Sequence, residues 1–410
     1  MNIRITSGPA IVRSEVVLPA SKSISNRALI IQHLTEEDFV INNLSDADDT
    51  LRLRDALSSK SDLWHAGLGG TTARFLLALA AVKGKGKVID GDPPLRKRPI
   101  SVLADALTAL GAELEFLGDP GCLPVRINET ITAGGTLDVD TSVSSQFVSA
   151  LMLIGPCLDG GLVLNFHNEV LSRSYLNMTA IVMKDFGADV SLEQDKVVIA
   201  GSGYTARDYF IEPDWSAASY WYEIAALSDE AEIRFPALVD TPLQGDCKVM
   251  EFMGALGVQT TIDDKGITIR KQSGSEPVSY LNQEMHDSPD LGPACIAASA
   301  ALGITADFPG LKNFRIKESD RAYALQRELY KFRVRTDFCG GSKFKVYPHD
   351  GFDKREVSVK TYNDHRIALC LAPLAMKSGV ITIEDADVVK KSYPDYWDDL
   401  KEAGFTLEET

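Results

Sequence analysis

The sequence predicts an α/β protein built as two pseudo-symmetric lobes, each of three βαβαββ units. The first observation behind this prediction is a series of short polar or glycine segments that each run into an Ala- and Leu-rich helical stretch. The segments begin at Ser21, Gly69, Ser142, Asp214, His286 and Tyr362. After a first interval of about 50 residues, successive segments begin about 72–76 residues apart, a period typical of a repeated supersecondary unit.

A second series of helices interleaves with the first, and its members end alike. Their endings are Leu110-Gly111-Ala112, Phe186-Gly187-Ala188, Leu256-Gly257-Val258 and, more loosely, Phe332-Arg333-Val334 and Ala403-Gly404-Phe405. A glycine directly after an apolar residue suits a left-handed helix cap before a strand. Alternating stretches such as Lys196–Ile199 and Gly266–Ile269 predict strands, so each unit reads as strand–helix–strand–helix–strand–strand. Six such units are more than one hydrophobic core can hold, so the sequence predicts two lobes, with the chain crossing from one to the other near Asp214.

Composition limits the function classes. The 410 residues include 42 Lys+Arg and 58 Asp+Glu, a formal charge of −16, which argues against a broad nucleic-acid or membrane surface. Mean hydropathy is −0.05, and no apolar run reaches the roughly 18 residues of a membrane span. The six cysteines are scattered without a CxxC pair, as expected for reduced thiols in a cytoplasmic protein. The histidines show no metal-ligand spacing.

Unusual polar residues stand where strands end and helices begin, the position at which helix dipoles and N–H groups favour anions. Ser23 and Arg27 lie four residues apart and would share one helix face, with Lys22 just ahead. The alternative is an ordinary serine cap beside a solvated lysine. The glycine turn at 67–72 permits close backbone approach to a ligand but is neither a Walker loop nor a Rossmann fingerprint.

Two basic segments add candidate anion ligands. Arg96-Lys97-Arg98 precedes an expected helix start, where positive charge opposes the helix dipole; a solvated loop is the alternative. On a helix, Lys317 and Glu318 would lie four and three residues from Arg321 and share its face, unless the segment is an ordinary surface ion-pair ladder.

Further polar groups stand at other openings. The segment 142–146 offers serine hydroxyls and an amide, and Ser172 to Tyr175 adds more hydroxyls, although serine clusters are also ordinary caps. His365 and Arg366 open directly into an apolar helix, where a histidine is more often structural. Cations recur in corresponding openings: Lys22, Arg27, Arg98, Lys317, Arg321, Arg366 and Lys391. Gathered in one cleft, they would require a multiply charged anion as the usual occupant.

At these residues the chain resembles the 5-enolpyruvylshikimate-3-phosphate synthases of the enolpyruvyl transferase family. The motifs that carry the resemblance are Leu18–Leu29, Arg98-Pro99-Ile100, Ser142–Phe147, Gln244-Gly245-Asp246, Arg315–Arg321, Thr361–Arg366 and Pro394-Asp395-Tyr396. They occur in family order over essentially the whole chain and are jointly highly specific.

The resemblance implies the family's inside-out barrel fold, with two lobes joined by a hinge that close on substrate. The lobes are expected over residues 1–20 with 214–410 and over residues 21–213. It also implies transfer of the enolpyruvyl group of phosphoenolpyruvate to the 5-hydroxyl of shikimate 3-phosphate, by addition and elimination and without metal or organic cofactor. This is a step of chorismate and aromatic amino acid biosynthesis and the target of glyphosate. A monomer is expected.

The matched motifs imply residue roles. Phosphoenolpyruvate would be held by Lys22, Gly70, Arg98, Gln146, Arg321, Arg366 and Lys391. Shikimate 3-phosphate would be held by Lys22, Ser23, Arg27, Ser144, Ser145, Gln146, Ser172, Tyr175, Asp290, Asn313 and Lys317. Asp290 would take the 5-hydroxyl proton or orient that hydroxyl, Glu318 and Lys22 are candidates for proton transfer at C3, and His365 would be a neighbour.

Two departures and two rivals qualify the resemblance. Leu68 and Phe75 differ from the family's usual Asn-Ala-Gly-Thr-Ala-Met-Arg-Pro stretch and are expected to alter the wall of the phosphoenolpyruvate pocket, while Gly70 is retained. The sister transferase acting on UDP-N-acetylglucosamine uses a loop cysteine in the region matching 93–98, where this chain has none; Cys122 lies later. A non-catalytic anion-binding or RNA-end-processing relative would need a basic groove or would lose Asp290 and Glu318.

Overall fold

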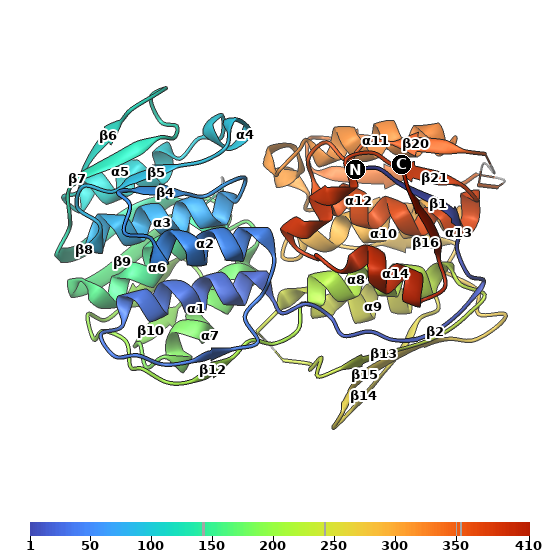
Figure 1. The fold of residues 1–410 in the computed structure, drawn as a ribbon, viewed down its shortest axis with the longest axis horizontal. Helices are drawn as coiled ribbons and strands as arrows, with labels where there is room; N and C mark the ends of the chain where they lie inside the picture. Colours follow the sequence, from blue (N-terminus) through green and yellow to red (C-terminus); the bar gives the residue numbers. More distant parts are fainter. Residues whose placement is uncertain (142–143, 242, 350, 353–354) are drawn as a thin grey trace. The chain divides into compact units, whose positions relative to one another are not determined.

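The computed structural model spans residues 1–410 and describes all of them except 142–143, 242, 350 and 353–354. The chain divides into two compact units (Figure 1). Unit 1 comprises Met1–Pro19 with Glu212–Thr410, and unit 2 comprises Ala20–Ile211. Within the described residues, every helix falls short of the length and apolar character needed to cross a membrane.

The core of unit 2 is a trio of helices that pack on one another: α1 (Lys22–Leu34), α3 (Gly70–Lys83) and α6 (Ser145–Ile154). Most of their residues are buried: α3 and α6 carry apolar side chains on nearly all faces, whereas α1 also buries polar side chains such as Asn26 and Arg27. Their polar residues are therefore concentrated at their first turns, which places the candidate binding residues at the N-terminal ends of these helices.

Two sheets of unit 2 share one topology. The first contains β4 (Leu63–His65), β5 (Val88–Asp90), β6 (Glu113–Phe116) and β7 (Val125–Glu129), and the second β8 (Ala133–Asp140), β9 (Asp159–His167), β10 (Val190–Leu192) and β11 (Lys196–Ile199). The strand orders are β4-β5-β7-β6 and β8-β9-β11-β10. In each, the first two strands are parallel and the last two form an antiparallel hairpin. With α5 (Ser101–Ala109) and α7 (Arg173–Asp185), these are the predicted βαβαββ units.

The third unit of this region is truncated, so the expectation of three complete βαβαββ units is wrong here. Parallel strands β12 (Tyr209–Phe210) and β3 (Ile41–Asn42) form a two-stranded sheet, followed by α2 (Asp48–Ser58). Residues 59–62 alone join α2 to β4, which leaves no length for the final hairpin. The missing hairpin explains why the first interval of the repeat is shorter than the others.

Unit 1 contains a second trio of core helices, α8 (Trp215–Leu227), α10 (Gly292–Leu302) and α12 (His365–Leu371), which pack together in one hydrophobic cluster. Three four-stranded sheets surround them (Figure 1). Their orders are β14-β15-β13-β2, β16-β17-β19-β18 and β20-β21-β1-β22. The strands are β1 (Ile3–Ser7), β2 (Ile11–Glu15), β13 (Glu230–Pro236), β14 (Gln259–Asp263), β15 (Gly266–Lys271), β16 (Tyr280–Asn282), β17 (Thr305–Phe308), β18 (Thr336–Cys339), β19 (Lys343–Val346), β20 (Val357–Val359), β21 (Ile381–Ile383) and β22 (Thr406–Glu409).

The N-terminal strands complete two of these sheets. Ile3 pairs with Ile383 across β1 and β21, and Ile11 pairs with Glu230 across β2 and β13. The first two strands of the chain therefore belong to unit 1, although residues 20–211 separate them from the rest of it.

The outer helices of unit 1 are α9 (Val249–Gly254), α11 (Arg321–Lys331) and α14 (Tyr396–Glu402). The predicted left-handed endings are confirmed, with φ of 103° at Gly111, 80° at Gly187, 92° at Gly257 and 98° at Gly404. Arg333 adopts the same conformation with φ of 62°, although it has a Cβ. The helical stretch expected over 367–376 is interrupted. The helix α12 ends at Leu371, and a 3-10 turn containing Pro373 separates it from α13 (Ala375–Ser378), because proline cannot donate the helical hydrogen bond.

Candidate active site

In unit 2, the candidate residues gather at the first turns of the core helices, whose unpaired N–H groups suit anions. Lys22, Gly70 and Ser145 are the first residues of α1, α3 and α6. The Lys22 Nζ lies 3.0 Å from Asp49 Oδ2, and Asp49 is 5% exposed. Lys22 is thus a half-buried, ion-paired lysine rather than a solvated one, and Asp49 is a member of the site that sequence reasoning missed.

Arg27 is held from several sides at this end of unit 2. Its Nε donates to Thr179 Oγ1 at 2.8 Å, its Nη1 to the Ser23 carbonyl at 2.7 Å, and its Nη2 to Ser149 Oγ at 3.3 Å and the Tyr175 carbonyl at 3.2 Å. Burial lowers the pKa of Arg27 to about 10, still far above neutrality. The guanidinium therefore ties α1 to α6 and α7 as a cation, and the expected shared face of Ser23 and Arg27 is confirmed.

Two guanidinium groups lie close to the glycine at the start of α3. A Cβ added at Gly70 would lie 2.6 Å from Nη1 of both Arg74 and Arg98. Arg74 Nη1 donates to Gln146 Oε1 at 2.8 Å, and its guanidinium lies 4.7 Å from the ring centroid of Phe147. Arg74 was not among the predicted site residues, yet it stands four residues after Gly70, the same spacing that selected Arg27 after Ser23.

The serine-rich openings serve partly as caps. Ser144 Oγ accepts the Gln146 N–H at 3.3 Å and caps α6, while Ser142 lies outside the described residues. Ser172 precedes α7 in the left-handed conformation with φ of 57°. That conformation costs an L-residue roughly 1–2 kcal/mol, and such strain is concentrated at functional sites.

Two predictions in this unit are corrected. Arg96 does not act with Arg98 as one basic patch, because its guanidinium pairs with Asp90 at 2.6 Å. Phe75 does not form a pocket wall: it is 1% exposed and lies in the core with the guanidinium of Arg27 5.5 Å from its ring centroid. Leu68, by contrast, is partly exposed at 36%.

In unit 1, Arg321 is the centre of a buried ion-pair network. Its guanidinium lies 2.9 Å from Asp290, 2.8 Å from Glu318 and 2.8 Å from Asp364, and the residue is 1% exposed. Burial opposes the charge of Arg321, but these carboxylates outweigh it and raise the pKa of the guanidinium above its ordinary value. Asp364 also accepts the Arg366 N–H at 3.1 Å as the cap of α12, so it is a second missed member.

The expected helix over 317–321 is wrong. Lys317 has extended backbone, with φ of −77° and ψ of −152°, and α11 begins only at Arg321. Asp320 sets this start by accepting the Tyr323 N–H at 2.9 Å. Glu318 still meets Arg321, but through a turn that precedes the helix rather than along a helical face.

Asp290, in the 3-10 turn η3 (Pro289–Leu291), is surrounded by cations. Arg366 Nη2 lies 2.9 Å from its carboxylate, and Lys317 Nζ lies 3.6 Å away. Burial alone would raise the pKa of Asp290, but the charges of Arg366, Lys317 and Arg321 hold it well below the ordinary value. Burial lowers the pKa of the neighbouring Lys317, and the negative charge of Asp290 partly offsets this effect. In this state Asp290 is a weak base that can accept hydrogen bonds.

The remaining predicted residues of unit 1 border this network. Lys391, in the 3-10 turn η6 (Ala386–Lys391), lies 3.3 Å from Glu318, and Asn313 is buried in η4 (Lys312–Ile316). His365 is 2% exposed by side chain, next to Arg366. Just ahead of it, Tyr362 and Asn363 both have φ of 56°, a strained turn that aims the start of α12.

These contacts correct the expectation of uncompensated cations. Lys22 pairs with Asp49, and the four cations of the unit 1 network share the carboxylates of Asp290, Glu318 and Asp364. Electrostatic repulsion between cations therefore does not by itself demand an anionic occupant. The sites are better described as paired charges whose partners a ligand can exchange.

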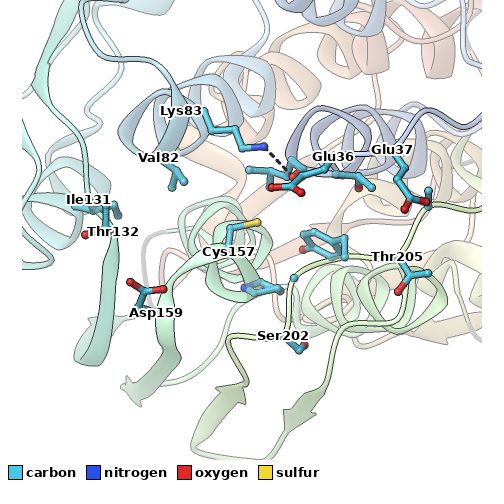
Figure 2. A pocket seen from close by; sticks show the side chains of 16 residues that line it. Glu36, Glu37, Val82, Lys83, Ile131, Thr132, Cys157, Asp159, Ser202 and Thr205 are labelled. Carbon is cyan, nitrogen blue, oxygen red and sulfur yellow. Dashed lines mark hydrogen bonds between the residues drawn. The ribbon is translucent and has the colours of Figure 1, made fainter.

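A separate cavity of about 690 Å³ lies at the other end of the unit 2 core helices (Figure 2). Leu34 and Lys83, at the C-terminal ends of α1 and α3, line it, and the Lys83 Nζ donates to the Leu34 carbonyl at 2.9 Å. Carboxylates of Glu36, Glu37 and Asp159 also border it. Helix C-termini and carboxylates disfavour anions, so this cavity does not suit a phosphorylated substrate.

Each unit of this α/β fold thus places cationic side chains at the first turns of its core helices, with hydroxyls in unit 2 and buried carboxylates in unit 1, an arrangement typical of enzymes that bind small anions. The model of the family EPSP synthase (3-phosphoshikimate 1-carboxyvinyltransferase) matches residues 6–59 and 56–400. The chain belongs to this family.

Relatives agree along the whole chain. The 3-phosphoshikimate 1-carboxyvinyltransferase of Bacteroides fragilis (strain YCH46) is 38% identical over 407 residues, 98% of either chain. The enzyme of that name from Idiomarina loihiensis is 32% identical over 425 residues, covering 95% of this chain and 96% of its own. A solved EPSP synthase from Acinetobacter baumannii superposes with a TM-score of 0.82 at 21% identity, covering 99% of each chain, which confirms the predicted fold class.

Proposed function

We propose that this protein transfers the enolpyruvyl group of phosphoenolpyruvate to the 5-hydroxyl of shikimate 3-phosphate and releases phosphate. The observation that carries the proposal is the match to 3-phosphoshikimate 1-carboxyvinyltransferases over nearly the full chain. The buried ion-pair network around Arg321 supports it, because it brings carboxylates for proton transfer next to cations for a phosphate or a carboxylate.

Each substrate is assigned a set of residues. Phosphoenolpyruvate is held by Lys22, the Gly70 backbone, Arg98, Gln146, Arg321, Arg366 and Lys391. Shikimate 3-phosphate is held by Lys22, Ser23, Arg27, Ser144, Ser145, Gln146, Ser172, Tyr175, Asp290, Asn313 and Lys317. Guanidinium groups suit the paired oxygens of carboxylates and phosphates, and hydroxyls suit a phosphate or a polyol.

The reaction proceeds by addition and then elimination. In the addition, the 5-hydroxyl gives its proton to Asp290 as its oxygen bonds to C2 of phosphoenolpyruvate and C3 gains a proton, which produces a tetrahedral ketal. In the elimination, C3 loses a proton as the C2–O bond to phosphate breaks. Lys22 and Glu318 are the assigned proton donor and acceptor at C3. Asp290 first orients the 5-hydroxyl, while its cation partners hold its pKa low. It accepts the hydroxyl proton once those partners turn to the substrate.

The remaining assignments follow the same proposal. The protein acts as a cytoplasmic monomer, with small molecules rather than nucleic acid or membrane as partners. The scattered thiols support the cytoplasmic assignment, and the formal charge of −16 supports the exclusion of nucleic acid and membrane.

The deciding experiment measures phosphate released from phosphoenolpyruvate in the presence of one acceptor at a time. Release with shikimate 3-phosphate but not with UDP-N-acetylglucosamine is the expected result. Release with the UDP-sugar alone would instead assign the protein to the sister transferase, and silence with both would remove the proposed activity.

A further inference from the structure

Asp246 is a buried carboxylate that the substrate assignments leave unused. It lies in the 3-10 turn η2 (Gly245–Lys248) and is 6% exposed. Its Oδ2 accepts a hydrogen bond from the hydroxyl of Ser216, in the first turn of α8. The backbone N–H of Ser216 is in turn fixed by the carboxylate of Asp214 at 2.7 Å, so the serine is held at both ends.

Ser216 connects this carboxylate to a guanidinium of the proposed site. Arg366 Nη2 donates to Ser216 Oγ at 3.4 Å and lies 2.9 Å from Asp290 Oδ2. Arg366 Nη1 donates to the Asp290 carbonyl at 3.1 Å and to Tyr220 Oη at 3.4 Å. When the Asp290 carboxylate turns to a substrate hydroxyl, the uncharged oxygens of Ser216, Tyr220 and the Asp290 carbonyl still hold this guanidinium in orientation.

The direction of the serine hydroxyl decides whether it can serve as such a guide. A hydroxyl has one hydrogen and two lone pairs. While Asp246 is ionised it takes that hydrogen, and the Ser216 lone pairs face the N–H of Arg366. If Asp246 is neutral, its own proton competes for a lone pair and the serine hydrogen is free to turn toward the guanidinium.

We infer that Asp246 is a positioning residue for enolpyruvyl transfer: acting through the Ser216 hydroxyl, its carboxylate orients the Arg366 guanidinium for phosphoenolpyruvate. This inference rests on the proposed function and on the assignment of Arg366 to that substrate. It gives a role to the Gln244-Gly245-Asp246 segment, which touches neither substrate in the assignments above.

The surroundings of Asp246 make this positioning dependent on pH. The charged groups that face it are Asp290 from η3, Arg366 from α12 and Asp214 at the start of α8, with the thiols of Cys247 and Cys295 nearby. Burial first, and then the charge of Asp290, raise the pKa of Asp246 to about 6. The ionised carboxylate is the form that orients the serine hydroxyl. This orientation is therefore present above about pH 6 and is lost as the pH falls through that value.

The test compares Asp246→Asn with Glu251→Gln, a neutralised exposed carboxylate on the adjacent helix α9. We expect Asp246→Asn to raise the KM for phosphoenolpyruvate about tenfold at pH 7.5, as for one charge-assisted hydrogen bond, and to leave the KM for shikimate 3-phosphate within about twofold. Between pH 5 and pH 7, wild-type KM for phosphoenolpyruvate should rise toward acid more steeply than that of the variant. The substrate's own phosphate titrates near pH 6, so it contributes equally to both proteins and cancels in their comparison.

A second variant keeps the inference testable if Asp246→Asn does not fold. Ser216→Ala should raise the same KM by a similar factor, and the double variant should be no worse than Ser216→Ala alone, because both changes break one chain of contacts. Given a wild type that turns over, three results would overturn the inference. The KM values of both substrates could rise equally, the effects of the two single variants could add in the double variant, or the KM for phosphoenolpyruvate could remain unchanged. Absence of turnover in the wild type would instead remove the proposed function.

Discussion

Arg321 shows how much a single side chain can depend on its partners. The guanidinium is 1% exposed and meets three carboxylates within 3 Å, so its removal would leave several buried negative charges uncompensated. Breaking such a buried pair from one side costs about 3–5 kcal/mol. A defect of an Arg321 variant would therefore mix lost folding with lost binding. Lys22 gives a cleaner test, because its side chain is less buried than that of Arg321 and pairs with Asp49 outside this network.

Replacing Lys22 by Met should lower kcat at least a hundredfold, because the variant loses both a cation for the substrate phosphate and an assigned proton carrier. Steady-state turnover with both substrates measures the effect, and Lys97→Met, which changes an exposed lysine, serves as control. A near-normal kcat in Lys22→Met would remove this residue from the mechanism.

Glu223 permits a stability prediction at the same scale. It is fully buried in α8, both of its carboxylate oxygens lack a hydrogen-bond partner among the described residues, and burial raises its pKa well above the ordinary value. A raised pKa of an acid means that the folded state prefers the protonated form, so stability present at pH 4 is lost as the pH rises beyond the unfolded pKa of 4.5.

Glu223→Gln should therefore melt at a higher temperature than the wild type at pH 8, with the difference shrinking toward pH 4. Thermal unfolding followed at a series of pH values measures this, and Glu251→Gln, at an exposed position, should show no such trend. A wild type that remains more stable than Glu223→Gln at pH 8 would contradict a neutral, unpaired Glu223.

At the scale of elements, the beginning of a helix places the site. Arg321 and Arg366 stand in the first turns of α11 and α12, and Asp320 and Asp364 cap those helices. A shift of either start by one residue would rotate the guanidinium by about 100° around the helix axis, away from its carboxylates. Caps at these helices are therefore part of the site even where they touch no substrate.

Asp320→Ala tests this reasoning, because Asp320 caps α11 from an exposed position outside the ion-pair network. We expect a loss of about 1 kcal/mol in the free energy of unfolding, measured with denaturant, and a raised KM for phosphoenolpyruvate. Asp105→Ala, within the exposed face of α5, is the matched control and should not destabilise the protein. An unchanged free energy of unfolding in Asp320→Ala would refute the capping role.

For the whole molecule, binding of both substrates should raise the melting temperature by mass action. At concentrations about a hundredfold above Kd a ligand stabilises the folded state by about 2.7 kcal/mol. Relief of cation repulsion adds little, since the cations already have carboxylate partners. Differential scanning fluorimetry with phosphoenolpyruvate and shikimate 3-phosphate measures the shift, with UDP-N-acetylglucosamine in place of the second substrate as control. An equal shift with the UDP-sugar would count against the assigned acceptor.

Local chemistry made much of this architecture predictable. Apolar runs predicted α3 and α10, and glycine after an apolar residue predicted the left-handed endings at Gly111 and Gly187, because these features depend on the nearest few residues. The helix expected at 317–321 failed for the same reason: residue spacing is informative only once the helix start is known, and the cap at Asp320 places that start later.

The amino-acid sequence alone determined the repeated α/β units, the polar helix openings and the family. Each of these is encoded in short segments of neighbouring residues. Tertiary structure decided which charges meet. The partners of Arg321 lie 3, 31 and 43 residues away along the chain, and the carboxylate that pairs with Lys22 lies 27 away. Packing likewise decided the truncated unit around β12 and β3, and the place of β1 and β2 in unit 1. Coulomb interactions and burial depend on distance in space, and a one-dimensional pattern does not contain that distance until the chain is folded.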